Sequence, residues 1–231
     1  MSESRWRASR TWWLLVDEGL SLVELVIDLN DRLAVGGVDR GFGGALALAY
    51  YVEDPRTTRD IDLNVSAPVE TAEEVFRLLP ASVAWDAKDV ARCIRDGQIR
   101  LWSKWHQTGI PVDLFFPQHE FHAAVAAGVT ERPFARADYR IPVIAAAHLA
   151  VFKALFDRPK DWVDIASMLA ARTVDVAEAA YWLGLLLGED HATVHRFVGL
   201  AGKAAAGLLA RPGAEMDTPA LDWRSLGHSP A

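Results

Sequence analysis

Two aspartates inside one short apolar run constrain this chain more than any other feature. The run DIDLNV begins at Asp60. Because side chains alternate along an extended backbone, Ile61, Leu63 and Val65 are predicted to face a core, whereas Asp60, Asp62 and Asn64 share the opposite face. Aspartate is disfavoured inside strands, and like charges this close repel each other unless a cation intervenes. The pattern predicts a divalent-metal site on a strand; the alternative is a solvated pair at a strand end.

A glycine pair precedes these acids. Gly43 and Gly44 stand between a short apolar segment at 38–42, a predicted strand, and an apolar helix predicted at 45–51. Glycine lets the backbone approach a ligand closely, and the free N–H groups at a helix start favour phosphate. The pair therefore predicts a phosphate cradle beside the metal site.

A third acid, Asp113, lies in the apolar run IPVDLFF. The segments 99–105 and 110–116 are predicted to form a hairpin around Thr108 and Gly109, with Asp113 on its second strand. One acid beside a buried strand is common, but its position after the first two acids favours a shared site. Mg²⁺ takes oxygen ligands and retains several waters, so two or three carboxylates and substrate phosphates suffice to bind it.

These residues carry a family resemblance. Gly43-Gly44, Asp60-x-Asp62 and Asp113 resemble the nucleotidyltransferase signature of the DNA polymerase beta superfamily. A later segment resembles the K…R.KD..D pattern of the AbiE-type toxin nucleotidyltransferases of type IV toxin–antitoxin systems, with Lys153, Arg158 and Lys160-Asp161-x-x-Asp164. Ala45 departs from the superfamily pattern, because many members have Ser or Thr after the glycines.

The resemblance implies an α/β (α+β) fold, in which helices flank a mixed sheet and a helical bundle follows it. It implies a nucleoside triphosphate as substrate and Mg²⁺ as cofactor, with Mn²⁺ as the alternative ion. Asp60, Asp62 and Asp113 would bind metal, and the catalytic set would comprise Asp60, Asp62, Asp113, Lys153 and Asp164. The nucleotide contacts would be Gly43, Gly44, Arg59, Arg158 and Lys160.

The resemblance also implies an acceptor and a partner. AbiE-type toxins suggest an RNA acceptor, such as the 3′ end of tRNA, and a cognate antitoxin. Other superfamily members modify proteins or small molecules, and a non-catalytic module that binds a nucleotide or a partner protein is the alternative from another functional class.

Several charged residues have two interpretations. Arg59 is interpreted as a triphosphate contact, and Arg56 as a neutraliser of Asp54 and of the Asp60–Asp62 pair. Lys153 is interpreted as a clamp on phosphate oxygens, since fixed positive charge stabilises phosphoryl transfer, although a helix-end lysine also reaches solvent readily. Asp164 either pairs with Lys160 at i,i+4 or orients Lys153.

The chain is predicted to divide near residue 141. Residues 1–141 would form the nucleotidyltransferase core, 142–210 a helical C-terminal part and 211–231 a flexible tail. Apolar periodicity predicts helices at 20–33, 72–79, 87–96, 143–156, 161–170, 175–187 and 191–209, with loop and strand at 131–141.

Composition limits the class of protein. The chain has 231 residues, 51% of them apolar, and a net charge of −7, which argues against a generic nucleic-acid-coating protein. Lys88, Arg92 and Arg95 fall at helical spacing, and a solvated face is preferred to an RNA-docking stripe. A single cysteine, Cys93, and the lack of a signal-like or membrane-spanning run indicate a soluble cytoplasmic protein.

Histidines and the cysteine do not suggest a further catalytic site. His191 with His195, and His119 with His122, are interpreted as surface or helix-capping pairs, because no additional metal ligand accompanies either pair. Cys93 is interpreted as a core residue.

Overall fold

A seven-stranded mixed sheet forms the centre of the computed structural model, which describes residues 21–103 and 109–209. The predicted tail at 211–231 lies outside the described residues. The strand order is β3-β4-β5-β2-β1-β7-β6, and β2 runs parallel to β5 but antiparallel to β1. The strands are β1 (Arg40–Phe42), β2 (Ile61–Val65), β3 (Val83–Ala84), β4 (Gln98–Ser103), β5 (Pro111–Phe115), β6 (Thr130–Phe134) and β7 (Arg136–Val143).

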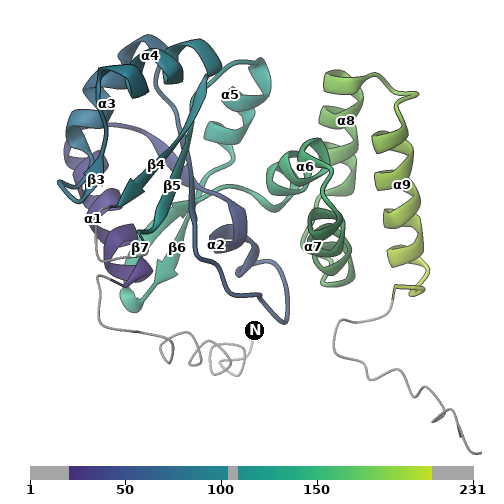
Figure 1. The fold of residues 1–231 in the computed structure, drawn as a ribbon. Helices are drawn as coiled ribbons and strands as arrows, with labels where there is room; N and C mark the ends of the chain where they lie inside the picture. Colours follow the sequence, from purple (N-terminus) through teal and green to yellow (C-terminus); the bar gives the residue numbers. More distant parts are fainter. Residues whose placement is uncertain (1–20, 104–108, 210–231) are drawn as a thin grey trace, which may run out of the picture.

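Helices cover the sheet and extend beyond it. In Figure 1, α1, α3 and α4 lie on one side of the sheet, and α6 to α9, coloured green to yellow, lie on the other, with α9 outermost. The helix α6 contacts α2, which follows β1, and also packs against α7 and α8. The helices are α1 (Leu22–Val35), α2 (Gly44–Leu48), the 3-10 helix η3 (Val69–Thr71), α3 (Ala72–Leu78), α4 (Ala87–Asp96), α5 (Glu120–Ala127), α6 (Ala146–Phe156), α7 (Pro159–Ala170), α8 (Val176–Leu187) and α9 (Ala192–Ala205).

Local sequence signals explain the helix boundaries closest to the predictions. Ser21 and Glu24 form a reciprocal capping box at the start of α1, and Gly36 ends that helix. Asp86 caps α4, while Gly97 ends it in the left-handed conformation. The helices flanking a mixed sheet, followed by a helical bundle, confirm the predicted fold class.

Strand β2 separates the core from the candidate site. Ile61, Leu63 and Val65 are buried in the main hydrophobic core, as the alternation predicted. Asp62 and Asn64 point to the other face, toward the helical half of the chain. The same alternation that builds the core therefore delivers polar groups to the opposite face.

The sequence-based start of the helical half was wrong. Residues 142–143 belong to β7, whose Val143 pairs with Phe42, and the helix begins only at Ala146. A continuous apolar run does not distinguish a buried strand end from a buried helix, so hydrophobic periodicity misplaced this boundary. The region predicted as loop and strand is a hairpin of β6 and β7. The division into domains remains a prediction.

No helix in the described parts of the chain combines the length and the hydropathy needed to cross a membrane.

Candidate active site

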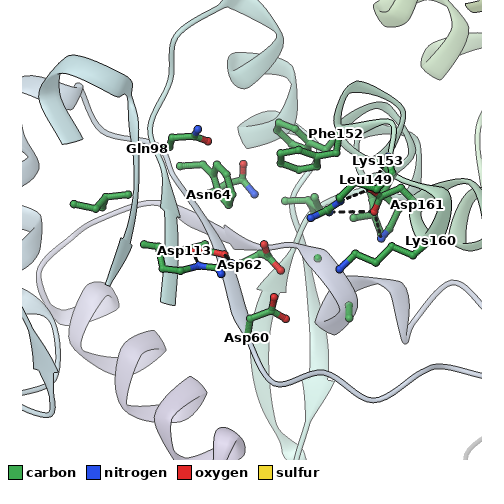
Figure 2. A pocket seen from close by; sticks show the side chains of 18 of the residues that line it. Asp60, Asp62, Asn64, Gln98, Asp113, Leu149, Phe152, Lys153, Lys160 and Asp161 are labelled. Atoms are coloured by element: carbon green, nitrogen blue, oxygen red, sulfur yellow. Dashed lines mark hydrogen bonds and ion pairs between the residues drawn. The ribbon is translucent and has the colours of Figure 1, made fainter. Parts of the chain in front are cut away.

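The three predicted acids meet on one face of two neighbouring strands. Asp62 on β2 lies directly opposite Asp113 on the parallel strand β5. Asp60 immediately precedes β2 and lies two residues from Asp62, so its side chain is on the same face. All three line a cavity of about 420 Å³ between the sheet and helices α6 and α7. Figure 2 shows these carboxylates together, with Lys153 and Lys160 projecting from the other wall.

Burial and the neighbouring acids destabilise the ionised form of Asp62. Burial, and then the negative charges of Asp60 and Asp113, raise the pKa of Asp62 to about 6, although Lys153 and Arg100 act in the opposite direction. A buried carboxylate whose charged form is destabilised beside two further acids has the chemistry of a cation site. Aspartate oxygens are the hard ligands that Mg²⁺ and Mn²⁺ prefer, so this donor set fits the predicted ion in type.

Protein groups partly neutralise the acids in this conformation. Arg100 on β4 donates two hydrogen bonds to Asp113, at 2.7 Å from Nε to Oδ1 and 2.5 Å from Nη2 to Oδ2. Thr58 Oγ1 donates to Asp60 Oδ1 at 2.6 Å. Within residues 21–103 and 109–209, no three His, Cys, Asp or Glu side chains are grouped closely enough to hold a metal ion as they stand. Arg100 engages both carboxylate oxygens of Asp113, so this pairing competes with metal binding at Asp113.

The glycine pair supports Asp62 from the adjacent chain segment. Gly43 N donates to the Asp62 carbonyl oxygen at 2.8 Å. Gly44 has a φ of +53°, and a Cβ at this position would lie 1.7 Å from Asp62 Oδ2. Gly44 is thus required by its backbone conformation and by the space that the Asp62 carboxylate occupies. Gly44 and Ala45 line the cavity.

The opposite wall of the cavity is built around a buried lysine. Lys153 on α6 donates from Nζ to Asp164 Oδ2 at 2.6 Å, and Asp161 Oδ1 lies 3.9 Å from the same nitrogen. Arg56 also binds Asp164, with its Nη2 3.1 Å from Oδ2. Of the two interpretations of Asp164, the contact with Lys153 is the one observed. Arg56 was predicted to neutralise Asp54, Asp60 and Asp62. This prediction was wrong, because the carboxylate that Arg56 binds is Asp164.

The start of α7 brings further positive charge to this wall. Arg158 donates to the fully buried Asp161 at 2.6 Å from Nε and lies over the Phe156 ring, 4.8 Å from its centroid. Pro159 at the first helical position favours this helix start. Lys160 is exposed and lines the cavity. Lys153, Arg56, Arg158 and Lys160 outnumber the two buried carboxylates, so this wall carries net positive charge.

The structure separates the other predicted residues from this cavity or assigns them a structural role. Arg59 is exposed and is not among the residues that line the cavity, so its phosphate contact stays a prediction. His119 and His191 each cap a helix start, which confirms the capping interpretation, and Cys93 is buried. Arg95 pairs with the neighbouring Asp96, as expected for a solvated face, whereas Arg92 lines the cavity.

Arg100 and Asp161 line the cavity although neither was predicted as a site residue, whereas Asn64 lies on the same face as Asp60 and Asp62, as the alternation predicted. The face on which Arg100 lies could have been predicted from the sequence. Along β4, the exposed Gln98, Arg100 and Trp102 alternate with the buried Ile99, Leu101 and Ser103. Its pairing with Asp113 depends on the hairpin register, which the sequence did not specify. Asp161 stood in the quoted motif, but its complete burial is a tertiary property.

Comparisons with known proteins support the fold. One solved structure is a nucleotidyltransferase-like antigenic protein from Paracoccidioides brasiliensis, which is 15% identical, matches with a TM-score of 0.50 and covers 84% of this chain and 95% of its own. JHP933 from Helicobacter pylori is 14% identical, with a TM-score of 0.39 and coverage of 90% and 93%. No protein-family profile matches the chain. No curated protein matches it either.

The chain therefore has the mixed α/β fold of a nucleotidyltransferase-like protein. At this level of identity the likeness concerns the fold, and the assignment to the AbiE type remains a prediction.

Replacing glycine by alanine should cost more stability at Gly44 than at a comparable turn elsewhere in the chain. The new Cβ would displace the Asp62 carboxylate, and the alanine would have to keep an unfavourable left-handed φ. Gly37→Ala is the matched control, because Gly37 has a φ of +70° and no atoms within 4 Å of the added Cβ. We expect Gly37→Ala to lower the free energy of unfolding by about 1 kcal/mol, and Gly44→Ala to lower it further and to abolish Mg²⁺ binding. Urea unfolding and calorimetric Mg²⁺ titration measure both effects; equal losses in the two variants would contradict the proposed contact.

Metal-free protein should lose stability as pH rises through the Asp62 titration. The folded-state pKa is raised to about 6 from an ordinary 3.8, so the stabilising contribution of the protonated form is complete below the ordinary value and is lost as pH passes about 6. Asp62→Asn should therefore be more stable than wild type by on the order of 1–2 kcal/mol at pH 7.5 in chelator, with the difference vanishing near pH 4. Mg²⁺ should stabilise only the wild type. A constant difference from pH 4 to 7.5 would show that burial and the neighbouring acids do not destabilise the ionised form of Asp62.

Proposed function

We propose that this protein transfers a nucleoside monophosphate from a nucleoside triphosphate to an acceptor hydroxyl. The observation that carries the proposal is the opposition of charge across one cavity. Asp60, Asp62 and Asp113 line the sheet side, while Lys153, Arg158 and Lys160 line the helical side. A complex of a divalent ion with a triphosphate matches both walls, because the ion meets carboxylates and the phosphate oxygens meet cations.

Each wall would have its own task in this reaction. Asp60 and Asp62 would hold Mg²⁺, and Asp113 would help to hold a second ion and to deprotonate the acceptor hydroxyl. When bound, the ions would stabilise the attacking and leaving oxygens of an in-line displacement. The acceptor oxygen would form a bond to the α-phosphorus as the bond from that phosphorus to the β-phosphate oxygen breaks, and pyrophosphate would leave.

The helical wall would position and neutralise the departing phosphates. Lys153 is held by Asp164 on the buried side of α6, which restricts its ammonium group to one position. Arg158 is held in the same way by Asp161. Because phosphoryl transfer needs little covalent help from a protein, preorganised cations of this kind supply most of the catalysis.

We propose that the acceptor is an RNA, with the 3′ end of tRNA as the first candidate. The protein would then act as the toxin of a toxin–antitoxin pair with a cognate antitoxin. The supporting structural feature is a shallow groove of Arg92, Arg100 and Trp102, in which both arginines also line the main cavity. Trp102 is half exposed, and an exposed aromatic ring beside arginines suits a single-stranded nucleic acid. Transfer to a protein or small molecule is the alternative.

A non-catalytic nucleotide- or partner-binding module is the second candidate. It is favoured by the Arg100–Asp113 pair, which occupies the third acid, and by Ala45, which offers no hydroxyl to phosphate. Such a module would bind a nucleotide without turning it over.

Incubation with Mg²⁺, each α-labelled nucleoside triphosphate and total tRNA tests the enzyme against the module. We expect label on RNA with wild type and a loss of at least ~100-fold with Asp60→Ala/Asp62→Ala, since removing metal ligands removes the largest electrostatic contribution. Adding cell lysate in place of tRNA detects transfer to protein. Nucleotide binding without transfer under any condition would establish the module instead, and absence of both binding and transfer would overturn the proposed function.

Replacing Lys88, Arg92 and Arg95 together by Ala tests the RNA acceptor. Loss of phosphate contacts predicts weaker RNA binding and a shallower dependence of affinity on salt concentration. The control is Arg32→Ala/Arg77→Ala, two exposed, ion-paired arginines on helices α1 and α3 that do not line the cavity. Unchanged RNA affinity and salt dependence in the triple variant, measured by filter binding, would remove the stripe from the acceptor site.

A further inference from the structure

The cavity has two chemically different ends. One end holds the carboxylates, and the other is lined by Ile144, Leu149 and the aromatic rings of Phe115, Phe152 and Phe156. The rings of Phe115 and Phe156 are 6.3 Å apart at their centroids. Figure 2 shows Phe152 and Leu149 on the same side of the carboxylates as Asn64. A ligand that fills the whole cavity must therefore have a charged part and a flat or apolar part.

Asn64 is the buried polar group at the apolar end, where the exposed Gln98 also lines the cavity. Asn64 is 8% exposed, lines the cavity, and its Oδ1 has no hydrogen-bond partner in the described structure. Another buried asparagine, Asn30, shows the usual arrangement: its Oδ1 accepts from Arg40 and its Nδ2 donates to Tyr139. Leaving a buried amide oxygen unpaired is unfavourable, so Asn64 is explained best by a ligand that donates a hydrogen bond to it.

We propose that Asn64 and the aromatic end of the cavity form a nucleobase subsite that selects bases with an exocyclic amino group. The inference rests on the proposed function. A nucleobase has apolar faces that pack against phenylalanine rings, and a polar edge that an amide side chain can bind. With the Asn64 amide in the orientation of this structure, the amino group of adenine or cytosine donates to Oδ1, whereas the corresponding carbonyl of hypoxanthine or uracil has no proton to donate to it.

The strand geometry places the subsite at a suitable separation from the carboxylates. Asn64 follows Asp62 by two residues on the same face of β2, a separation of about 6.6 Å along the strand. A ribose can therefore lie between a phosphate held near Asp62 and a base held near Asn64. The base belongs either to the triphosphate or to the terminal nucleotide of the acceptor.

Two pairs of triphosphates test the subsite, because each pair differs at one exocyclic position. ATP is compared with ITP and CTP with UTP, as non-hydrolysable analogues, by calorimetric titration in Mg²⁺. We expect wild type to bind the amino-bearing member of at least one pair roughly 10-fold more tightly or better, and Asn64→Leu to reduce this ratio to about 3-fold or less. Asn64→Asp retains the acceptor oxygen and should retain more of the ratio than Asn64→Leu.

Melting temperature separates recognition from a structural role. Asn64→Leu removes an unpaired buried polar group, so its melting temperature should equal or exceed that of wild type. Ser103→Ala is the matched control, because Ser103 Oγ is also buried and has no partner among residues 21–103 and 109–209, but does not line the cavity. This variant should leave the nucleotide ratios unchanged.

Each remaining outcome decides the inference. In one outcome, wild type shows no discrimination among triphosphates but prefers acceptor oligonucleotides ending in A or C to those ending in U. If Asn64→Leu loses that preference, the base belongs to the acceptor. Mg²⁺-dependent binding and transfer with base ratios insensitive to Asn64 overturns the subsite and leaves the proposed function intact. Failure of every triphosphate to bind overturns both.

Discussion

The burial of Asp62 beside two further carboxylates is the constraint around which the candidate site is arranged. The parallel register of β2 and β5 places Asp62 opposite Asp113, and the bend before β2 adds Asp60. Burial and the two neighbouring charges raise the pKa of Asp62, so the fold maintains an electrostatic cost at this position. Such a cost persists only where the surrounding packing over-determines the geometry, and here Ile61 and Leu63 anchor the strand in the core.

Cations on the neighbouring elements compensate that negative charge from different distances. Arg100 neutralises Asp113 directly, from the adjacent antiparallel strand. Lys153 acts from across the cavity and is itself fixed by Asp164. Breaking a buried pair of this kind by removing one partner is expensive, because the remaining charge is left without compensation. The helical half of the chain therefore contributes a rigid cationic wall, which is the property that a triphosphate site requires.

Part of the site was predictable because its signals are local. Alternation in the run from Asp60 to Val65 follows from strand geometry alone, and Gly44 is required by a positive φ and by the adjacent Asp62 carboxylate. The pairing of Asp164 with Lys153 rather than Lys160 was not predictable. Lys160 lies at the favourable i,i+4 helix spacing, and the contact with Lys153 depends on how α6 packs against α7. The end of β7 was misplaced because Val143 is apolar in either a strand or a helix, and its pairing with Phe42 decides between them.

The sequence by itself determined which residue types this protein can bring to the proposed phosphate–metal site: three aspartates in or next to strands, a glycine pair and a run of cations near the start of a helix. Periods of two and of 3.6 residues, together with caps and turn residues, are properties of the local chain and can be derived without a fold. Only the tertiary structure decided that Arg100 pairs with Asp113 and that Asp161 is fully buried. It also decided that Asn64 Oδ1 lies beside aromatic rings without a hydrogen-bond partner in the part of the chain that the structure describes. These features depend on strand register and on the packing of α6 and α7 against the sheet side of the cavity, which bring together residues distant in the chain.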